Sequence, residues 1–339
     1  MRVLQRFSLS VVLLAAWGGA HVAAAEPSPE ADKIPVIFDT DIGADIDDTW
    51  ALCLALKSPE FDVRLIVCDY PNLPAYQKMV YRGKIIGKML EAAGRTDIPV
   101  GLGAGEKEGR GKQRQEPWVE DYRLEDYPGT VHEDGVGAMT KTIMESEKPV
   151  TVIAVGPVSN LGVALQREPK IAENARFVGM HGSIDVGYGG RGDPAAEFNV
   201  KCNPEALQAV FAAPWEKTIT PLDTCGIVRI GSERYKKVRE SNDPLMRALM
   251  ENYRIWSGRK DGKLPGGSST LFDTVAIYLA ATDAEFCKME TLPLTVTDEG
   301  MTVIDRKNGR KVRAAVEWKD LDAFEDWIVE RLLSPTVQP

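Results

Sequence analysis

The chain has 339 residues, of which 44% are hydrophobic and 27% are charged, and its formal net charge is −9 at pH 7. These proportions are typical of a soluble globular protein. An acidic chain without a run of lysine and arginine is a poor candidate for nucleic-acid binding. The five cysteines include no C-x-x-C pair, which argues against a zinc site, and they indicate no disulfide framework.

Residues 1–25 have the features of a secretory signal peptide. Two arginines precede an apolar run from Leu9 to Trp17, and three alanines at 23–25 provide the small residues of a cleavage site. The apolar run is too short and wrongly flanked for a membrane span. We therefore expect an exported protein, periplasmic or secreted, with no membrane attachment after the signal is removed. Residues 26–33 read as a disordered lead-in.

Apolar runs alternate with helical patterns after an apolar strand at 34–38 and a helix at 50–56. The later runs are 63–68, 80–93, 98–101, 140–147, 150–155, 159–165, 176–180, 204–213 and 217–220. Strands that alternate with helices indicate βαβ units and a mainly parallel sheet. We expect a single α/β domain over residues 34–334, with a Rossmann-like, open, mainly parallel sheet flanked by helices.

Three polar, glycine-rich segments interrupt the alternation, at 101–137, 182–196 and 257–269. Long loops in a compact domain usually carry function, so we expect them to surround the active site. The C-terminal part predicts a hairpin over Leu294–Val316, with its turn at residues 307–309. An amphipathic helix over Leu321–Leu333 then closes the fold.

Five carboxylates fall within ten residues, directly after the strand at 34–38. They are Asp39, Asp41, Asp45, Asp47 and Asp48. Like charges a few ångströms apart repel, so the set needs protons or a cation. No basic residue lies between Lys33 and Lys57, which favours a metal ion. Oxygen ligands suit Ca²⁺ or Mg²⁺, and a loop of flexible carboxylates favours Ca²⁺. The alternative is an acidic helix N-cap with a solvated loop.

Two other classes share part of this pattern. The segment from Phe38 to Asp41 also opens phosphatases of the haloacid dehalogenase superfamily, but Ile42-Gly43 does not continue their motif and the acidic set is too dense. Asp39, Asp41 and Gly43 match part of an EF-hand loop, which would then require a bidentate glutamate that is absent here.

Further motifs follow the acidic cluster in a fixed order. They are Val155-Gly156-Pro157-Val158-Ser159-Asn160-Leu161, then Ala196-Glu197-Phe198-Asn199 with Asn203-Pro204-Glu205-Ala206, then Pro221-Leu222-Asp223, and finally Leu271-Phe272-Asp273-Thr274-Val275-Ala276. Together with Asp39-Thr40-Asp41 and Asp47-Asp48, they resemble the nucleoside hydrolases, the inosine–uridine preferring N-ribohydrolase family. The resemblance covers about residues 34–330.

The resemblance implies calcium-dependent hydrolysis of the N-glycosidic bond of a ribonucleoside or related N-riboside. Its implied calcium ligands are Asp41, Asp48, Asp273 and the main-chain carbonyl of Val155. Asp41 would be the general base for the attacking water, and the transition state would resemble an oxocarbenium ion. Asp47 and Asn199 would bind the ribose hydroxyls, with Glu197 toward the 5′ end. Relatives of this family are commonly homodimers or homotetramers, which we expect here too.

The chain departs from the family pattern at several positions. Phe272 replaces a histidine that protonates the leaving base in many members. Arg191 stands where an asparagine often approaches the ribose 5′-hydroxyl, and an arginine there could recognise an anionic substituent. Asp45 lies in a two-residue expansion of the acidic loop. The asparagine expected after Cys68 has no clear match, with Asp69 and Asn72 both possible.

Several roles stay open at this point. Asp273 precedes an apolar helix and could be an ordinary N-cap, whereas Asn160 is expected to support its turn or helix. Asp39 could orient neighbouring groups. The aromatic residues Tyr188, Trp256 and Phe272 are candidates to stack on the base. The histidines left after signal removal, His132 and His181, are expected to be structural or peripheral. A noncatalytic ribosyl-binding member of the same fold is the remaining alternative.

Overall fold

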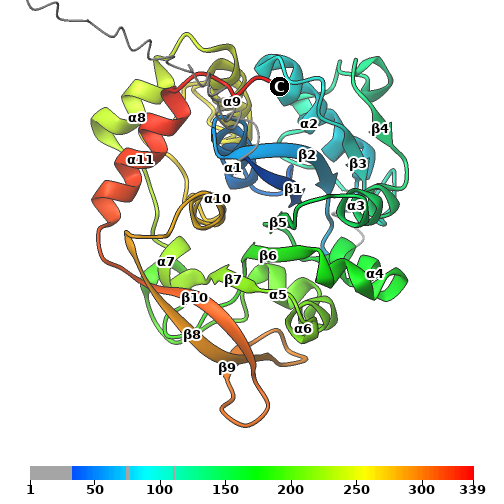
Figure 1. Cartoon of the computed structure of the whole chain (residues 1–339). Coiled ribbons are helices and arrows are strands. Elements are labelled where there is room, and N and C mark those ends of the chain that lie inside the picture. The colour runs from blue at the N-terminus through cyan, green and yellow to red at the C-terminus, as the bar shows by residue number, and fades with distance from the viewer. Residues whose placement is uncertain (1–32, 74–76, 110) are drawn as a thin grey trace, which may run out of the picture. The chain divides into compact units, whose positions relative to one another are not determined.

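A mostly parallel sheet of ten strands runs through the described part of the chain in the order β4-β3-β2-β1-β5-β6-β7-β10-β8-β9 (Figure 1). The strands are β1 (Ile34–Thr40), β2 (Phe61–Cys68), β3 (Val100–Leu102), β4 (Val131–His132), β5 (Val150–Ala154), β6 (Ala175–Met180), β7 (Lys217–Thr220), β8 (Cys287–Val296), β9 (Thr302–Ile304) and β10 (Arg310–Trp318). Among the strand pairs of the described residues, those that β8 makes with β10 and β9 are antiparallel and the others are parallel. The predicted single α/β domain with an open, mainly parallel sheet is confirmed.

The structure is a computed structural model that describes residues 33–73, 77–109 and 111–339. The predicted signal peptide at 1–25 and the lead-in up to residue 32 lie outside these residues and stay predictions. Within the described ranges, no helix combines the length and apolar character that crossing a bilayer requires.

Helices cover both faces of the sheet. They are α1 (Asp47–Leu56), α2 (Met79–Ala93), α3 (Gly135–Met144), α4 (Ser159–Arg167), α5 (Phe198–Cys202), α6 (Pro204–Ala212), α7 (Leu222–Cys225), α8 (Ser232–Arg239), α9 (Pro244–Trp256), α10 (Thr274–Ala281) and α11 (Leu321–Leu333). Successive side chains of a strand point to opposite faces, so β1 contributes Phe38 to one core and Ile37 to the other.

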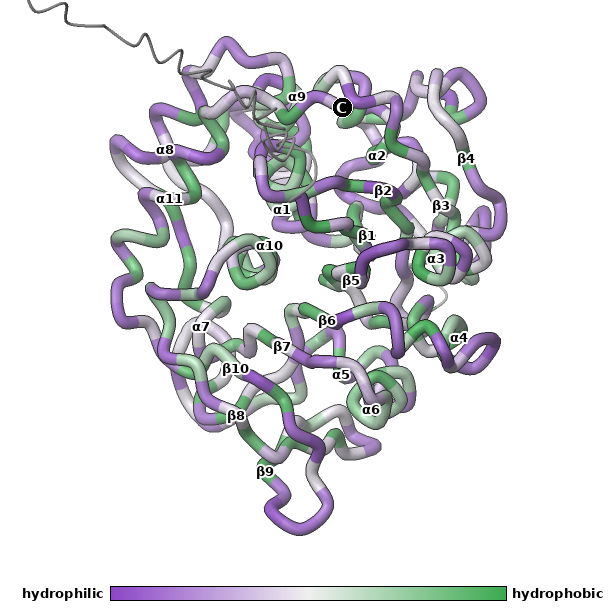
Figure 2. The backbone as a smooth tube through the Cα atoms, viewed as in Figure 1, coloured by the Kyte–Doolittle hydropathy of each residue, from purple (hydrophilic) through white to green (hydrophobic). Residues whose placement is uncertain are grey.

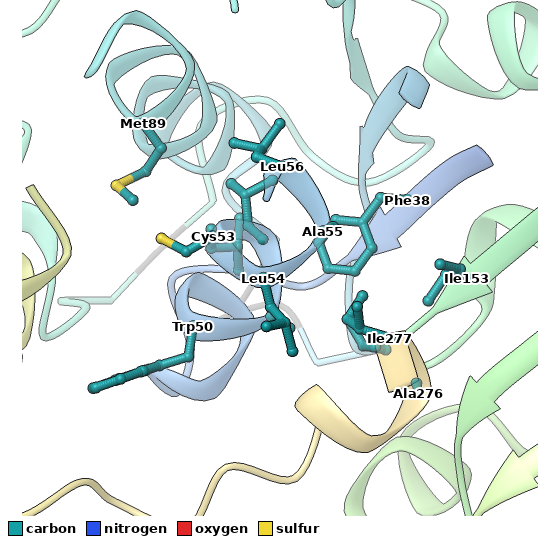
Figure 3. Close-up of a cluster of buried hydrophobic side chains, with 14 of the residues drawn as sticks. Phe38, Trp50, Cys53, Leu54, Ala55, Leu56, Met89, Ile153, Ala276 and Ile277 are labelled. Carbon is teal, nitrogen blue, oxygen red and sulfur yellow. The ribbon is translucent and has the colours of Figure 1, made fainter. Parts of the chain in front are cut away.

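The larger core packs α1, α2 and α10 against one face of the sheet. Figure 3 shows Phe38 of β1 and Ile153 of β5 facing side chains of these helices, among them Leu54 and Ile277. Every residue of α1 is buried, as expected for a helix that is hydrophobic on all sides. The tube in Figure 2 is correspondingly hydrophobic along much of α10 and β5.

The C-terminal strands differ from the predicted hairpin. Leu294 of β8 pairs with Ile304 of β9 on one side and with Arg310 of β10 on the other. The segment at 307–309 therefore connects two strands that do not pair with each other, because β8 lies between them. The turn that closes a hairpin comes earlier, between β8 and β9, where Gly300 adopts a φ of 84°.

The strand order places a natural ligand site beside β1. From β1 the chain continues outward through β2, β3 and β4, and it then returns to β5 on the opposite side of β1. The crevice outside the carboxyl ends of such neighbouring strands is the usual ligand site of open α/β sheets. The acidic loop begins at that point, directly after Thr40.

Candidate active site

The acidic loop over residues 41–46 turns the chain from β1 into α1 and is held from behind by α2. Gly43 has a φ of 104°, and a Cβ there would lie 2.8 Å from the Tyr81 ring, so glycine is required at this turn. The Tyr81 hydroxyl donates to the Gly43 carbonyl oxygen over 3.2 Å. Arg82 donates to the carbonyl oxygen of Ile42 over 2.7 Å.

A cavity of about 380 Å³ opens above this loop. The structure brings to its wall most of the residues that the sequence singled out. These are Asp41, Asp47, Asp48, Val155, Glu197, Asn199, Phe272 and Asp273. They come from the ends of β1 and β5 and from the starts of α1, α5 and α10, so residues more than 200 positions apart in the sequence share one cavity.

Three buried carboxylates form the tightest cluster. One oxygen each of Asp47, Asp48 and Asp273 lie within 4.8 Å of one another, an arrangement that could hold a metal ion. Asp41 lines the same cavity but is not part of this close trio. The sequence analysis gave Asp41, Asp48 and Asp273 as the carboxylate ligands, whereas the trio contains Asp47 instead of Asp41. Asp273 is the N-cap residue of α10, yet its side chain makes no capping hydrogen bond, so the N-cap alternative does not explain it.

Burial and mutual repulsion make these carboxylates hard to ionise. Burial raises the pKa of Asp41 from 3.8 to about 6, although the guanidinium of Arg82 lowers it. Burial also raises the pKa values of Asp48 and Asp273 well above the ordinary range, and the neighbouring aspartates raise them further. Buried oxygens that repel one another in this way fit a hard divalent cation.

A basic side chain from outside the segment between Lys33 and Lys57 lies near the acidic loop, which the sequence analysis did not consider. Arg82 lies on α2, about forty residues along the chain, is 1% exposed and lowers the pKa values of Asp41 and Asp48. Its positive charge offsets part of the repulsion. The pKa values of both aspartates nevertheless stay raised, so burial outweighs the arginine.

A second layer of acids lies behind the cavity wall. The side chain of Asn160 donates to Asp39 over 2.8 Å and to the Cys68 carbonyl oxygen over 2.9 Å. The backbone N–H groups of Ser159 and Asn160 donate to Asp69 over 3.2 and 3.1 Å. Asn160 thus links α4 to the ends of β1 and β2. Of the two residues considered after Cys68, Asp69 is buried in this layer and Asn72 is exposed.

The opposite wall is organised by α5. Glu197 caps this helix by accepting from the N–H groups of Asn199 at 2.8 Å and Val200 at 3.2 Å. The side chain of Asn199 donates to the Val155 carbonyl oxygen over 2.9 Å and to that of Met180 over 3.2 Å. The Val155 carbonyl therefore already has one hydrogen bond, and its second lone pair is available to a ligand.

Arg191 is not brought to the cavity. It is exposed and pairs through its backbone with Gly187 around a tight turn. This turn instead places Tyr188 on the cavity wall, with its ring edge-on to Phe272 at 6.2 Å between centroids. The substrate contact predicted for Arg191 is therefore not supported by the structure.

The two remaining histidines lie outside the cavity lining. His181 is fully buried, and its Nε2 lies 2.9 Å from the Gly156 carbonyl oxygen. Burial lowers the pKa of His181 to about 4, so the ring is neutral at pH 7. His132 belongs to β4, near the edge of the sheet.

The sequence analysis missed Arg114, which lines the cavity from the segment between β3 and β4.

The model of inosine-uridine preferring nucleoside hydrolases matches residues 36–326. The chain belongs to this family. It is a nucleosidase, an enzyme that hydrolyses the N-glycosidic bond of ribonucleosides.

Relatives of known activity and solved structures agree with this assignment. The chain is 31% identical over 325 residues to the pyrimidine-specific ribonucleoside hydrolase RihA of Citrobacter koseri, covering 88% of this chain and 98% of the relative. An inosine-uridine preferring nucleoside hydrolase from Bacillus anthracis has a TM-score of 0.70 at 20% identity, covering 88% of this chain and 99% of that structure. A purine-preferring ribonucleoside hydrolase from Gardnerella vaginalis has a TM-score of 0.68 at 21% identity, covering 88% and 98%. Both structures have the same fold as this chain.

Proposed function

We propose that the chain hydrolyses ribonucleosides with a calcium ion held by the buried carboxylates at the end of β1. The single observation that carries this proposal is the trio Asp47, Asp48 and Asp273, whose oxygens converge within 4.8 Å. Asp41 and the Val155 carbonyl oxygen line the same cavity and would complete an all-oxygen ligand set. Export, inferred from residues 1–25, would place the protein where calcium is plentiful.

Asp41 is the proposed general base that accepts a proton from the attacking water. A bound calcium ion would hold the carboxylates ionised and acidify water that contacts it. Asp47 can accept hydrogen bonds from the ribose hydroxyls. Asn199 is oriented for the same role because its amide nitrogen is fixed by the carbonyl oxygens of Val155 and Met180.

The carboxylates have a second task during bond cleavage. As the C1′–N bond breaks, the ribose gains oxocarbenium character, and the negative wall of the cavity stabilises this positive charge. Glu197 accepts three backbone hydrogen bonds, from Gly182, Asn199 and Val200. We therefore give Glu197 a positioning role toward the 5′ end, because it fixes the start of α5 and with it Asn199.

We propose pyrimidine ribonucleosides as the first substrates, in keeping with the specificity named for the Citrobacter koseri relative. The test follows the release of ribose from uridine, cytidine, inosine and adenosine by the mature protein. We expect cleavage with calcium, loss after chelation, recovery on adding calcium, and loss in Asp41→Ala. Asp62→Ala removes an aspartate of β2 whose side chain is 42% exposed, and it is the matched control.

Two results would overturn this proposal. Activity that is indifferent to chelation would exclude the metal role. Calcium binding without cleavage of any nucleoside would favour a noncatalytic ribosyl-binding protein. The homodimer or homotetramer stays a prediction, and light scattering of the purified protein tests it.

A further inference from the structure

Arg114 forms a stacked arrangement at the mouth of the cavity. Its guanidinium carbon lies 5.3 Å from the centre of the Trp256 ring, and both residues line the cavity. Trp256 ends α9 and stacks in turn on Tyr253, with 5.7 Å between the ring centroids and 23° between the planes. A cation over an aromatic face is attracted by the ring, so Trp256 gives the exposed guanidinium a preferred position.

The backbone that presents Arg114 is anchored by the next residue. Gln115 is fully buried, and its amide nitrogen donates to the Asp45 carbonyl oxygen over 2.6 Å. Its amide oxygen accepts from Asn252 of α9 over 2.7 Å. These bonds connect the segment between β3 and β4 to the acidic loop and to α9. The backbone next to Arg114 is therefore held in place on the cavity wall.

The sign of the charge separates Arg114 from the rest of the site. Among the described residues that line the cavity, it is the only basic one, whereas several are aspartates. Negative groups suit a ribose that becomes positive, but a departing base gains electron density and requires a donor or a positive charge. Phe272 has no proton to give. Arg114 is the lining residue whose charge matches the departing base.

We propose that Arg114 binds the leaving base while Trp256 holds the guanidinium in position, and that the guanidinium donates hydrogen bonds to a carbonyl oxygen conjugated with the glycosidic nitrogen. This inference rests on the proposed function. It restricts the substrates to nucleosides of carbonyl-bearing bases, such as 2-oxopyrimidines or 6-oxopurines. Trp256 stacks on the guanidinium and helps to hold it at the base.

The step adds one water across the C1′–N bond. The electron pair of that bond passes to the base nitrogen and its conjugated carbonyl oxygen, where the guanidinium stabilises it. The water oxygen forms the new bond to C1′, one water proton goes to Asp41 and then to solvent, and the released base takes a proton from solvent. The arginine lowers the need for a proton donor at position 272.

The test compares uridine with 5-fluorouridine, whose fluorine makes the base a better leaving group. Loss of a hydrogen bond to a charged group lowers kcat/KM by about 10- to 100-fold, and we expect this loss for Arg114→Ala on uridine. A clearly smaller loss is expected on 5-fluorouridine, because its base needs less stabilisation. Arg114→Lys should lose less than Arg114→Ala, since it keeps the charge. Arg123→Ala, in the same inter-strand segment with a side chain 71% exposed, should match the wild type.

Each contrary result has a distinct meaning. An equal loss on both nucleosides, or no loss, would overturn the role of Arg114 while leaving calcium-dependent hydrolysis intact. A loss seen only with uridine 5′-monophosphate would assign Arg114 to a 5′ substituent and overturn the inference. Failure of the wild type to cleave either nucleoside would instead refute the proposed function, and this inference with it.

Discussion

Removing calcium should make the stability of the protein fall as the pH rises. Without a cation, burial raises the pKa of Asp41 from 3.8 to about 6, so the folded state binds protons more tightly than the unfolded state. A raised carboxyl pKa gives stability that is complete below the unfolded value and is lost as the pH rises through the folded value. For Asp41 alone this loss amounts to about 3 kcal/mol at neutral pH. The raised pKa values of Asp48 and Asp273 act in the same direction.

Calcium should reverse this loss because, as we propose, it would bind the ionised carboxylates. A ligand at one hundred times its dissociation constant stabilises the folded state by about 2.7 kcal/mol. The folded unit spans Lys33–Pro339. Because the entropy of unfolding is about 2.1 cal/mol/K per residue, this stabilisation corresponds to a Tm increase of about 4 °C. The increase should be smaller at about pH 5, where protons compete with calcium for the cluster.

Thermal unfolding followed by circular dichroism measures this effect on the mature protein, with chelator or with excess calcium, from about pH 5 to about pH 8. We expect the calcium-induced Tm increase to grow with pH. An increase that is absent, or that is equal at both ends of the pH range, would refute the reasoning. Magnesium at the same concentration is the comparison that reports on selectivity.

Three further predictions concern single residues. Asp48→Asn should abolish the calcium-induced Tm increase, measured as above, while leaving the chelated protein at least as stable as the wild type; a retained increase would exclude Asp48 as a ligand. Gly43→Ala should lower the free energy of unfolding by about 1–3 kcal/mol, because alanine is strained at positive φ and its Cβ would meet Tyr81. Urea unfolding measures this, and an unchanged midpoint would contradict it. Lys57→Ala should cost about 3 kcal/mol in the same assay, since the fully buried ammonium contacts Asp243 at 2.9 Å; calcium binding by the variant should persist, and its loss would contradict a purely structural role.

The sequence predicts the central fold well because the pattern there is local. Buried strands read as short apolar runs and helices as longer ones, and the boundaries of β2, β6 and α2 differ from the predicted ones by no more than two residues. The acidic loop was recognisable for the same reason, since its carboxylates are close in sequence. Asp273 and Asn199 were found through their motifs, because the sequence alone does not show that they meet the loop.

What the sequence could not predict depends on tertiary proximity. Arg82 and Arg114 lie in α2 and in a long irregular segment, and only the fold brings them to the acidic loop. Arg191 lies close to the motif of Glu197 in sequence, but a turn with three left-handed glycines determines where it lies. The C-terminal hairpin was misjudged because β8 begins at Cys287, before the predicted start, and lies between β9 and β10 in the sheet.

The distribution of positive charge indicates which part of the cluster needs a cation. Arg82 lowers the pKa values of Asp41 and Asp48, and Arg114 lowers that of Asp45. The main influences on Asp273 are burial and three aspartates, all of which raise its pKa. The protein therefore compensates charge on the acidic loop and leaves the Asp273 side without compensation. A divalent ion bound there would neutralise Asp47 and Asp273, because no arginine is among the main influences on the pKa of either carboxylate. For this reason we propose that calcium binds between α1 and α10.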